Sequence, residues 1–347
     1  MRLRERASAS LNLVAMVKLQ FVEAPSIRPP GPPIGVLASL VAGFDRVASH
    51  PALLLPPVLL DLFLWSGPPL RMTSLIREVT RVLTDLAAAD PGMVERLGLI
   101  QADMADVALR FNLFSALSSV PVGIPSLMAA RLPPASPLGI VPGFEVTSAG
   151  AALAIWGLLQ AIGLGIGAAY HRAIARLHAA DLAPGGGWPL WGKMLLAGIL
   201  TYVGAMAATA VTILVVSLAA LIIPILAVGV LFIGFSLLTW VAIYLAFTPH
   251  GMVRYRFGIF RAMGESVILV RGNLFGVVGF LGMAFLISGL TGMLWELPGE
   301  TLWLNLLALF GHSIVSAALL AGSYAFYQGR WEWLARLRAA ARAQVQV

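Results

Sequence analysis

Three polar side chains interrupt the long apolar stretches of this sequence: Asp61, Gln160 and His312. Polar groups are costly to place in hydrocarbon, so their presence there indicates a specific role. Counted from the ends of the apolar stretches, the three residues lie at similar depths and could meet. One interpretation is a proton-handling or polar-substrate site. The other is hydrogen bonding between helices, which contributes about 0.6–2 kcal/mol per pair. If Asp61 and His312 lie on unrelated faces, the first interpretation fails.

The remaining candidate residues are histidines. His171 and His178 are seven residues apart, and only Asp181 could join them as a metal ligand, so we expect a solvated helix face. His50 and His250 each lie beside a proline at the end of an apolar stretch, where interfacial imidazoles are common. The sequence has no cysteine, no HExxH motif, no phosphate-binding loop and no nucleophile elbow. We therefore predict no metal, no cofactor and no enzymatic activity.

Composition indicates a membrane protein. Hydrophobic residues make up 59% of the chain, charged residues only 11%, and the mean hydropathy is +0.89. Soluble domains contain about a quarter charged residues. The net charge of +7 does not indicate a nucleic-acid partner, because the arginines cluster beside the ends of apolar stretches, where they orient a membrane protein.

The apolar stretches predict an all-α fold, a bundle of six transmembrane helices with interfacial amphipathic helices. A helix of about 20 residues is needed to cross roughly 30 Å of hydrocarbon. The uncharged block 194–247 is too long for one helix, so we expect a hairpin that breaks near Ala219–Pro224. Besides a first span at Pro51–Ser66, five clearer spans are expected at 149–170, 194–218, 221–247, 274–295 and 302–327.

The first span is shorter and less regular than the others. We expect Ser49 to cap its helix, with Pro51 in the first turn. The Pro56-Pro57 pair should bend the helix, and Gly67-Pro68-Pro69 should end it. The charge of Asp61 in this span is the feature that sequence alone leaves unexplained.

The predicted organisation has five parts. They are an N-terminal amphipathic and Pro-rich cytoplasmic segment (1–35), a surface helix with the first span (36–70), an extracytoplasmic helical cap with a Pro-rich interfacial loop (71–147), the five-helix remainder of the bundle (148–330) and a basic cytoplasmic tail (331–347). Whether residues 111–130 dip into the membrane stays open. Residues 254–273 and 331–343 are expected to be helices that lie on the inner leaflet.

The distribution of Lys and Arg predicts the orientation. Seventeen of the 23 lie in the segments 1–46, 171–193, 254–271 and 330–342, which places these segments and both termini in the cytoplasm. The residues expected to anchor the chain at the anionic inner leaflet are Arg254, Arg256, Arg261, Arg271, Arg330, Arg336 and Arg338.

Two glycine pairs have the spacing of helix-packing faces. Gly163 and Gly167 belong to the span 149–170, and Gly276 and Gly279 to the span 274–295. Glycines at this spacing let two helix backbones approach closely. No strand is predicted before either pair, so they are not a dinucleotide-binding fingerprint.

The region from about 194 to 335 resembles the uncharacterised bacterial membrane proteins grouped with the glycerophosphoryl diester phosphodiesterase membrane domain. The resemblance rests on ESVILVRGNLFGVVGF (265–280) and SYAFYQGRW (323–331). It implies a membrane part that accompanies, or occurs without, a separate catalytic barrel. That barrel is absent, and His171-Arg172 is followed by Ala173 instead of the glycine of the phosphodiesterase motif, so the family's activity is not expected.

These observations predict a non-enzymatic scaffold or accessory protein of the bacterial inner membrane. Its expected partners are membrane lipids and a protein that contacts residues 71–147, and nucleic acid is not among them. The alternative is a small transporter or permease component in which Asp61, Gln160 and His312 line the path. That alternative requires a continuous polar cavity that reaches Asp61.

Overall fold

The computed structural model describes residues 31–87, 104–119, 122–136, 138–139, 141–178, 187–297 and 303–345. The chain divides into two compact units, residues 34–330, and residues 1–33 with 331–347. The fold is all-α, as predicted. Five described helices are long and apolar enough to cross a membrane, and a bent helix pair makes a sixth if it counts as one span.

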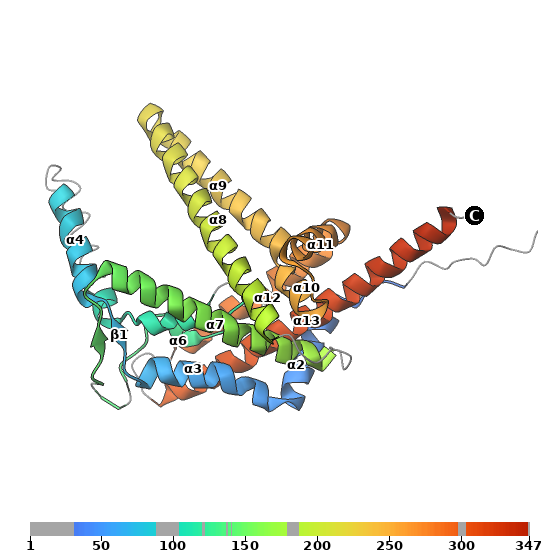
Figure 1. The fold of residues 1–347 in the computed structure, drawn as a ribbon, viewed down its shortest axis with the longest axis horizontal. Helices are drawn as coiled ribbons and strands as arrows, with labels where there is room; N and C mark the ends of the chain where they lie inside the picture. Colours follow the sequence, from blue (N-terminus) through green and yellow to red (C-terminus); the bar gives the residue numbers. More distant parts are fainter. Residues whose placement is uncertain are drawn as a thin grey trace, which may run out of the picture. The chain divides into compact units, whose positions relative to one another are not determined.

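The elements of the first half connect the first predicted span to the predicted cap (Figure 1). They are α2 (Val36–Ser49), the 3₁₀ helix η1 (Pro51–Leu54), α3 (Leu55–Ser66), β1 (Leu70–Arg71), α4 (Thr73–Ala87), η2 (Leu113–Leu117), α6 (Leu127–Ala130) and β2 (Phe144–Glu145).

The second half consists of helices. They are α7 (Ala149–His178), α8 (Gly187–Ile222), α9 (Pro224–Leu245), α10 (Thr248–Arg254), α11 (Ile259–Gly272), α12 (Leu274–Glu296) and α13 (Leu304–Val345). Residues 331–343 are helical, and they continue α13 from the last predicted span without a break.

The first span is broken at His50, not at the proline pair. The helical segments on either side of His50 meet at 97°. Pro56 and Pro57 lie in the first turn of α3, where the missing N–H of proline has no helical acceptor to lose. The prediction of a kink at these prolines is therefore wrong, because they begin a helix instead of interrupting one.

The sequence correctly predicted where α3 ends, but it did not predict the role of Ser49. Ser49 does not cap the following helix; it is the last residue of α2, and its hydroxyl donates to the Asp45 carbonyl at 2.7 Å. α3 ends at Ser66 with Gly67 as its C-cap, as predicted.

α2 packs along α13, although the sequence predicts a helix on the membrane surface. A Cβ on Gly43 would overlap the Ala318 carbonyl, and a Cβ on Gly322 would lie 3.0 Å from the Ser39 carbonyl oxygen. At the other end of this contact, Arg330 Nη1 donates to the Ile34 carbonyl at 2.8 Å. α2 therefore runs antiparallel to α13, and small residues allow the close approach.

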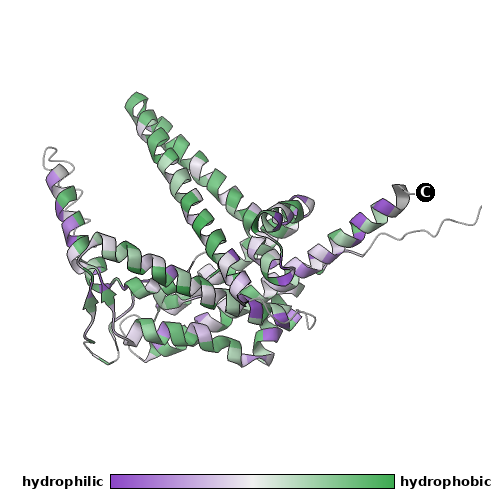
Figure 2. Cartoon of the chain, viewed as in Figure 1, coloured by the Kyte–Doolittle hydropathy of each residue, from purple (hydrophilic) through white to green (hydrophobic). Residues whose placement is uncertain are grey.

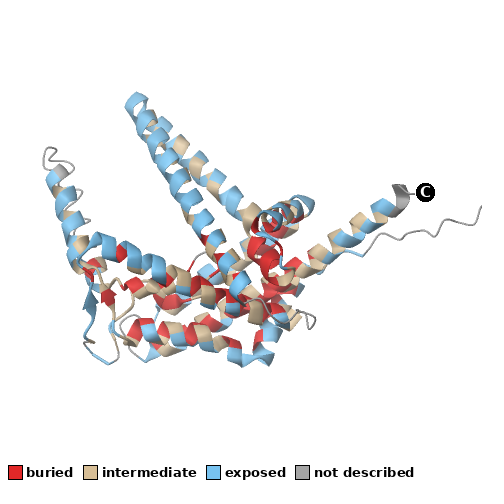
Figure 3. Cartoon of the chain, in the orientation of Figure 1, coloured by how far each residue is buried: buried red, intermediate tan, exposed pale blue. Residues whose placement is uncertain are grey.

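α8 and α9 form the predicted hairpin, with the break at Ile223 between them. Both are hydrophobic along most of their length (Figure 2) and largely exposed (Figure 3). Their most apolar 18-residue windows are only 6% and 0% buried. A helix that is apolar all round and uncovered by protein is suited to contact lipid.

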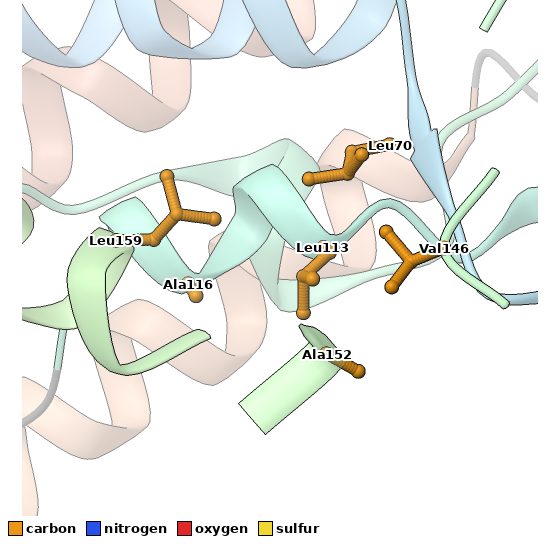
Figure 4. Close-up of a cluster of buried hydrophobic side chains, with 6 residues drawn as sticks. All are labelled: Leu70, Leu113, Ala116, Val146, Ala152 and Leu159. Atoms are coloured by element: carbon orange, nitrogen blue, oxygen red, sulfur yellow. The ribbon is translucent and has the colours of Figure 1, made fainter. Parts of the chain in front are cut away.

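The region 71–147 is closed by a short parallel pairing of β1 with β2, in which Leu70 pairs with Phe144 and Arg71 with Glu145. The carboxylate of Glu145 accepts hydrogen bonds from the Ser74 N–H at 2.8 Å and from its hydroxyl at 2.9 Å. Next to this pairing, an apolar cluster combines side chains from β1, η2, α7 and the residue after β2 (Figure 4): Leu70, Leu113, Ala116, Val146, Ala152 and Leu159.

Candidate functional site

Asp61 is fully buried in α3. Its carboxylate accepts a hydrogen bond from the Ser126 hydroxyl and from the backbone N–H groups of Leu127 at 3.1 Å and Met128 at 3.0 Å. The same Ser126 oxygen accepts from the Ala129 N–H at 3.0 Å, so Ser126 is the N-cap of α6. Asp61 and Ser126 together satisfy three N–H groups of this short helix.

This arrangement follows from the requirements of a helix end. The first N–H groups of a helix have no partner within it, and a carboxylate at that end also interacts favourably with the helix dipole. In an apolar interior, water cannot take its place. Asp61 therefore connects α3 to α6 across 65 residues of sequence.

Arg131 follows α6 and extends the polar network to two more helices. Its Nη1 donates to the Trp295 carbonyl at 3.0 Å, and its Nη2 to the Asn305 Oδ1 at 2.9 Å. The carboxylates of Glu296 and Asp61 both lie within electrostatic range of this guanidinium. The guanidinium thus joins α12 and α13 to the segment that Asp61 holds.

The predicted cluster of Asp61, Gln160 and His312 does not form. The Gln160 side-chain oxygen is buried and has no hydrogen-bond partner among the described residues. His312 Nε2 lies 3.2 Å from the Ser316 hydroxyl on its own helix. Arg131 is the group that interacts electrostatically with both Asp61 and His312. The three residues have similar predicted depths in the membrane but do not meet, because residues 122–131 occupy the space beside Asp61.

The glycines of α7 accommodate this inserted segment, which we define as the described residues 113–119 and 122–131. A Cβ on Gly163 would overlap Ser119 and the Leu117 carbonyl, and a Cβ on Gly167 would overlap the Val122 carbonyl. The two glycines do allow a close approach, but the prediction of a second spanning helix as their partner is wrong: the partner is the end of η2 and the backbone that follows it. Such backbone is tolerated at membrane depth only where protein covers it.

Several side chains of the inserted segment are buried inside the protein. Val122 is 0% exposed and Met128 1% exposed. The contact of Val122 with Gly167 lies about 27 Å along α7 from Ala149, at 1.5 Å per residue. The described part of the segment therefore runs along much of α7.

The second glycine pair plays a different part from the one predicted. A Cβ on Gly276 would meet the side chains of Asn273 and Arg330, and a Cβ on Gly279 would make an ordinary 3.9 Å contact with Val36. Neither glycine is required for close packing of two helix backbones. Gly276 instead leaves room for a guanidinium at the start of α12.

A second buried polar cluster lies between α7, α10 and α13. His171 Nδ1 lies 3.1 Å from the Tyr324 hydroxyl, and His250 Nε2 lies 2.8 Å from the Ser323 hydroxyl. Because the Ser323 hydroxyl donates to the Leu320 carbonyl at 2.7 Å, it must accept from His250, whose Nε2 carries the proton. His250 Nδ1 has no partner among the described residues.

These positions correct two predictions about the histidines. His171, which was predicted to lie on a solvated helix face, is only 5% exposed. His250, which was predicted to lie at an interface, is only 6% exposed. The reason is that α10 turns back after α9 and contacts α7. His178 is half-buried, His50 is exposed at the bend, and Asp181 lies outside the described residues.

Three of the residues predicted to anchor the chain, Arg254, Arg256 and Arg261, lie at the turn between α10 and α11, where they are joined by basic residues of α7 and α8. Lys193 Nζ donates to the Arg256 carbonyl at 3.1 Å, and the guanidinium of Arg261 lies 4.3 Å from the Phe257 ring centroid. Arg172 lies within electrostatic range of Arg176 and Arg256. We call this set the basic band: Arg172, Arg176, Lys193, Arg254, Arg256 and Arg261.

The other predicted anchoring residues lie outside this band. Arg271 is exposed in the last turn of α11, whereas Arg330 is only 4% exposed. Arg336 and Arg338 lie on the part of α13 that belongs to the smaller unit, where Arg338 lies over the Trp331 ring.

Both oxygens of the Asp61 carboxylate are occupied by hydrogen bonds, whereas Arg131 Nε has no partner among the described residues. Sequence reasoning found Asp61 but missed Ser126 and Arg131. Ser126 could have been recognised as an N-cap before the apolar run Leu127–Ala130. No group of three or more His, Cys, Asp or Glu side chains suited to a metal ion occurs among the described residues.

Comparison with known proteins gives no relative from which a role could be transferred. No family model matches the chain, and neither the curated proteins nor the solved structures include a match.

Proposed function

We propose that the protein is a non-enzymatic scaffold or accessory protein of the bacterial inner membrane that binds anionic lipid at its cytoplasmic face, with both termini in the cytoplasm. The observation that carries the proposal is the basic band. Cations from α7, α8, α10, α11 and the turn at Arg256 gather at one end of the helices. Each basic residue near an anionic leaflet contributes about 1 kcal/mol of attraction.

The course of α2 and α3 along α13 supports six crossings. Ile34 contacts Arg330, Gly43 contacts Ala318, and Val58 and Leu64 belong to an apolar cluster with Leu309. The bent pair thus follows α13 from residue 330 back to residue 309. A pair that traverses the length of a spanning helix supports placing the N-terminal and C-terminal segments on the same side.

The hydrogen bonds that the Asp61 carboxylate already accepts favour a structural role over a role in transport. A path for a polar substrate needs side chains that can exchange partners with the substrate. Both Asp61 oxygens already accept hydrogen bonds from Ser126, Leu127 and Met128, and Gln160 and His312 do not join them. The transporter alternative therefore has less support than the scaffold.

Cysteine labelling tests the orientation, because the chain has no native cysteine. In intact spheroplasts, a membrane-impermeant maleimide should label Arg77→Cys in α4, and it should label Arg336→Cys only after permeabilisation. Labelling of Arg336→Cys from outside would contradict a cytoplasmic C-terminus.

Thermal unfolding in neutral detergent tests lipid binding. Added phosphatidylglycerol should raise the unfolding temperature more than phosphatidylcholine does, because a ligand that binds only the folded state stabilises it. The difference should shrink in high salt. Arg261→Gln should reduce it, whereas Arg77→Gln removes an equal charge from the opposite predicted face and should not. Equal stabilisation by both lipids would contradict the proposal.

The proposal also includes a protein partner at residues 71–147. Its support is that α4 exposes Val79, Val82 and Leu83, at 55%, 43% and 48%. Cross-linking of Val82→Cys in native membranes should give one adduct of defined mass, and an adduct of twice the chain mass would identify a second copy. An adduct pattern identical to that of Arg77→Cys would contradict a specific contact.

A further inference from the structure

The N-terminus of α12 has hydrogen-bond donors that the helix itself does not satisfy. Its N-cap, Asn273, makes no side-chain capping bond. Val277 N–H donates to the Asn273 carbonyl, whereas the N–H groups of Leu274, Phe275 and Gly276, the first three of the helix, have no acceptor within it. Such groups, together with the helix dipole, favour an anion at a helix N-terminus.

A buried cation faces this first turn. Arg330 is 4% exposed, and its guanidinium carbon lies 3.4 Å from the Phe326 ring centroid. Its Nη2 lies 3.0 Å from the position that a Cβ on Gly276 would occupy. The guanidinium is therefore directed at the start of α12, and the absence of a side chain at Gly276 permits the approach.

Arg330 is incompletely paired. Nη1 donates to the Ile34 carbonyl, but Nε is buried and has no partner among the described residues. The ion pairs found in the described chain do not include Arg330, and no carboxylate contributes to its electrostatic environment. A buried guanidinium normally has a compensating anion, because burial of an unpaired charge is costly.

The surroundings indicate where such an anion would come from. Arg271 is exposed two residues before Asn273, and Phe275 is 93% exposed in the first turn of α12. An exposed aromatic ring beside basic residues is typical of a segment that enters the boundary between lipid headgroups and acyl chains. A free anion in water would gain nothing from Phe275.

We propose that the first turn of α12, together with Arg330 and Arg271, binds the phosphate group of an anionic membrane lipid. The N–H groups of Leu274, Phe275 and Gly276 donate to phosphate oxygens, and Arg330 supplies a charge-assisted hydrogen bond. Phe275 contacts the lipid chain. This site deepens the proposed function and rests on it, since it names one specific position for the lipid that the basic band attracts.

Native mass spectrometry of the full chain tests the site, with phosphatidylglycerol and phosphatidylcholine as probes. Arg330→Gln should weaken phosphatidylglycerol binding about tenfold or more, the effect of losing a charge-assisted hydrogen bond. Arg336→Gln, which removes the same charge from the same helix, should bind nearly as well as the unmodified chain. Equal losses in the two variants would overturn the site and leave general electrostatic binding.

Two further variants keep the test decisive if Arg330→Gln does not fold. Gly276→Ala places a methyl group against the flexible ends of Asn273 and Arg330, so the fold should persist while phosphatidylglycerol binding falls. Unchanged binding in this variant would overturn the site. Phe275→Ala should weaken binding of the lipid but not of inorganic phosphate, and equal effects on both would overturn the assignment to lipid.

The outcomes also separate this inference from the proposed function. If the unmodified chain prefers phosphatidylglycerol and only Arg261→Gln reduces that preference, the basic band binds lipid and the α12 site is wrong. If the unmodified chain shows no preference, both are wrong.

Discussion

The Asp61 carboxylate in α3 accepts a hydrogen bond from the hydroxyl of Ser126, which caps α6. The two residues lie 65 positions apart in the sequence. This contact pairs a carboxylate in an apolar helix with the start of α6, a short helix of the inserted segment. The charge that looked anomalous in the sequence is thus the acceptor that the inserted segment requires.

Replacement of Asp61 by alanine should destabilise the fold strongly. The Ser126 hydroxyl and the N–H groups of Leu127 and Met128 would lose their acceptor in a buried site, at an expected cost of about 2–4 kcal/mol. Thermal unfolding in detergent measures the loss. Asp45→Ala, at an exposed position of α2, is the matched control and should be nearly neutral. Similar unfolding temperatures for the two variants would show that Asp61 is not a structural acceptor.

Gly167→Ala should displace the inserted segment. The new methyl group would overlap the Val122 carbonyl, and overpacking of this kind typically costs about 1–3 kcal/mol. Gly157 lies on the same helix, and a Cβ there would have no atom within 4 Å, so Gly157→Ala should be neutral or slightly stabilising. Limited proteolysis of residues 113–131 should be faster in Gly167→Ala alone. The same rate in both variants would argue against close packing at Gly167.

The junction of β2 with α4 should weaken in acid. Burial would raise the pKa of Glu145, but hydrogen bonds from Ser74 outweigh it and the pKa is lowered. A carboxylate with a lowered folded-state pKa stabilises the fold above its ordinary pKa, and this contribution is lost as pH falls through the lowered value. The protection factor of the Ser74 amide, its hydrogen-exchange rate corrected for the intrinsic pH dependence of exchange, should fall over that range. In Glu145→Gln the protection factor should depend less on pH, and an unchanged dependence would contradict the assignment.

The bond between His171 and Tyr324 should appear in a double-mutant cycle. We compare His171→Phe, Tyr324→Phe and the double variant, each of which keeps an aromatic ring in the cluster. The expected interaction free energy is about 1 kcal/mol in thermal or chemical unfolding. Tyr202→Phe on α8 serves as a control, because Tyr202 contacts Trp156 through its ring. Additive effects of His171→Phe and Tyr324→Phe would mean that the hydrogen bond contributes nothing.

Local sequence rules located the elements whose signals are strong. The long apolar stretches gave the spanning helices, Pro224 marked the turn of the α8–α9 hairpin, and Gly67 marked the end of α3. The same rules failed at Ser49 and at Pro56-Pro57, because the choice between capping, kinking and starting a helix depends on what the flanking segments contact.

The sequence by itself determined that this chain is an all-α protein with long apolar helices, and it identified Asp61 and the Gly163–Gly167 face as unusual. Those conclusions follow from hydrophobicity and from helical periodicity, which are properties of neighbouring residues. Only the tertiary structure decided what they contact. Asp61 meets Ser126 instead of His312, and Gly167 meets Val122 instead of a helix, because the described parts of the inserted segment, 113–119 and 122–131, pack against α7 and α3. Contacts between residues so distant in the chain leave no periodic pattern in the sequence. The predicted depth in the membrane therefore could not identify the partners of Asp61 and Gly167.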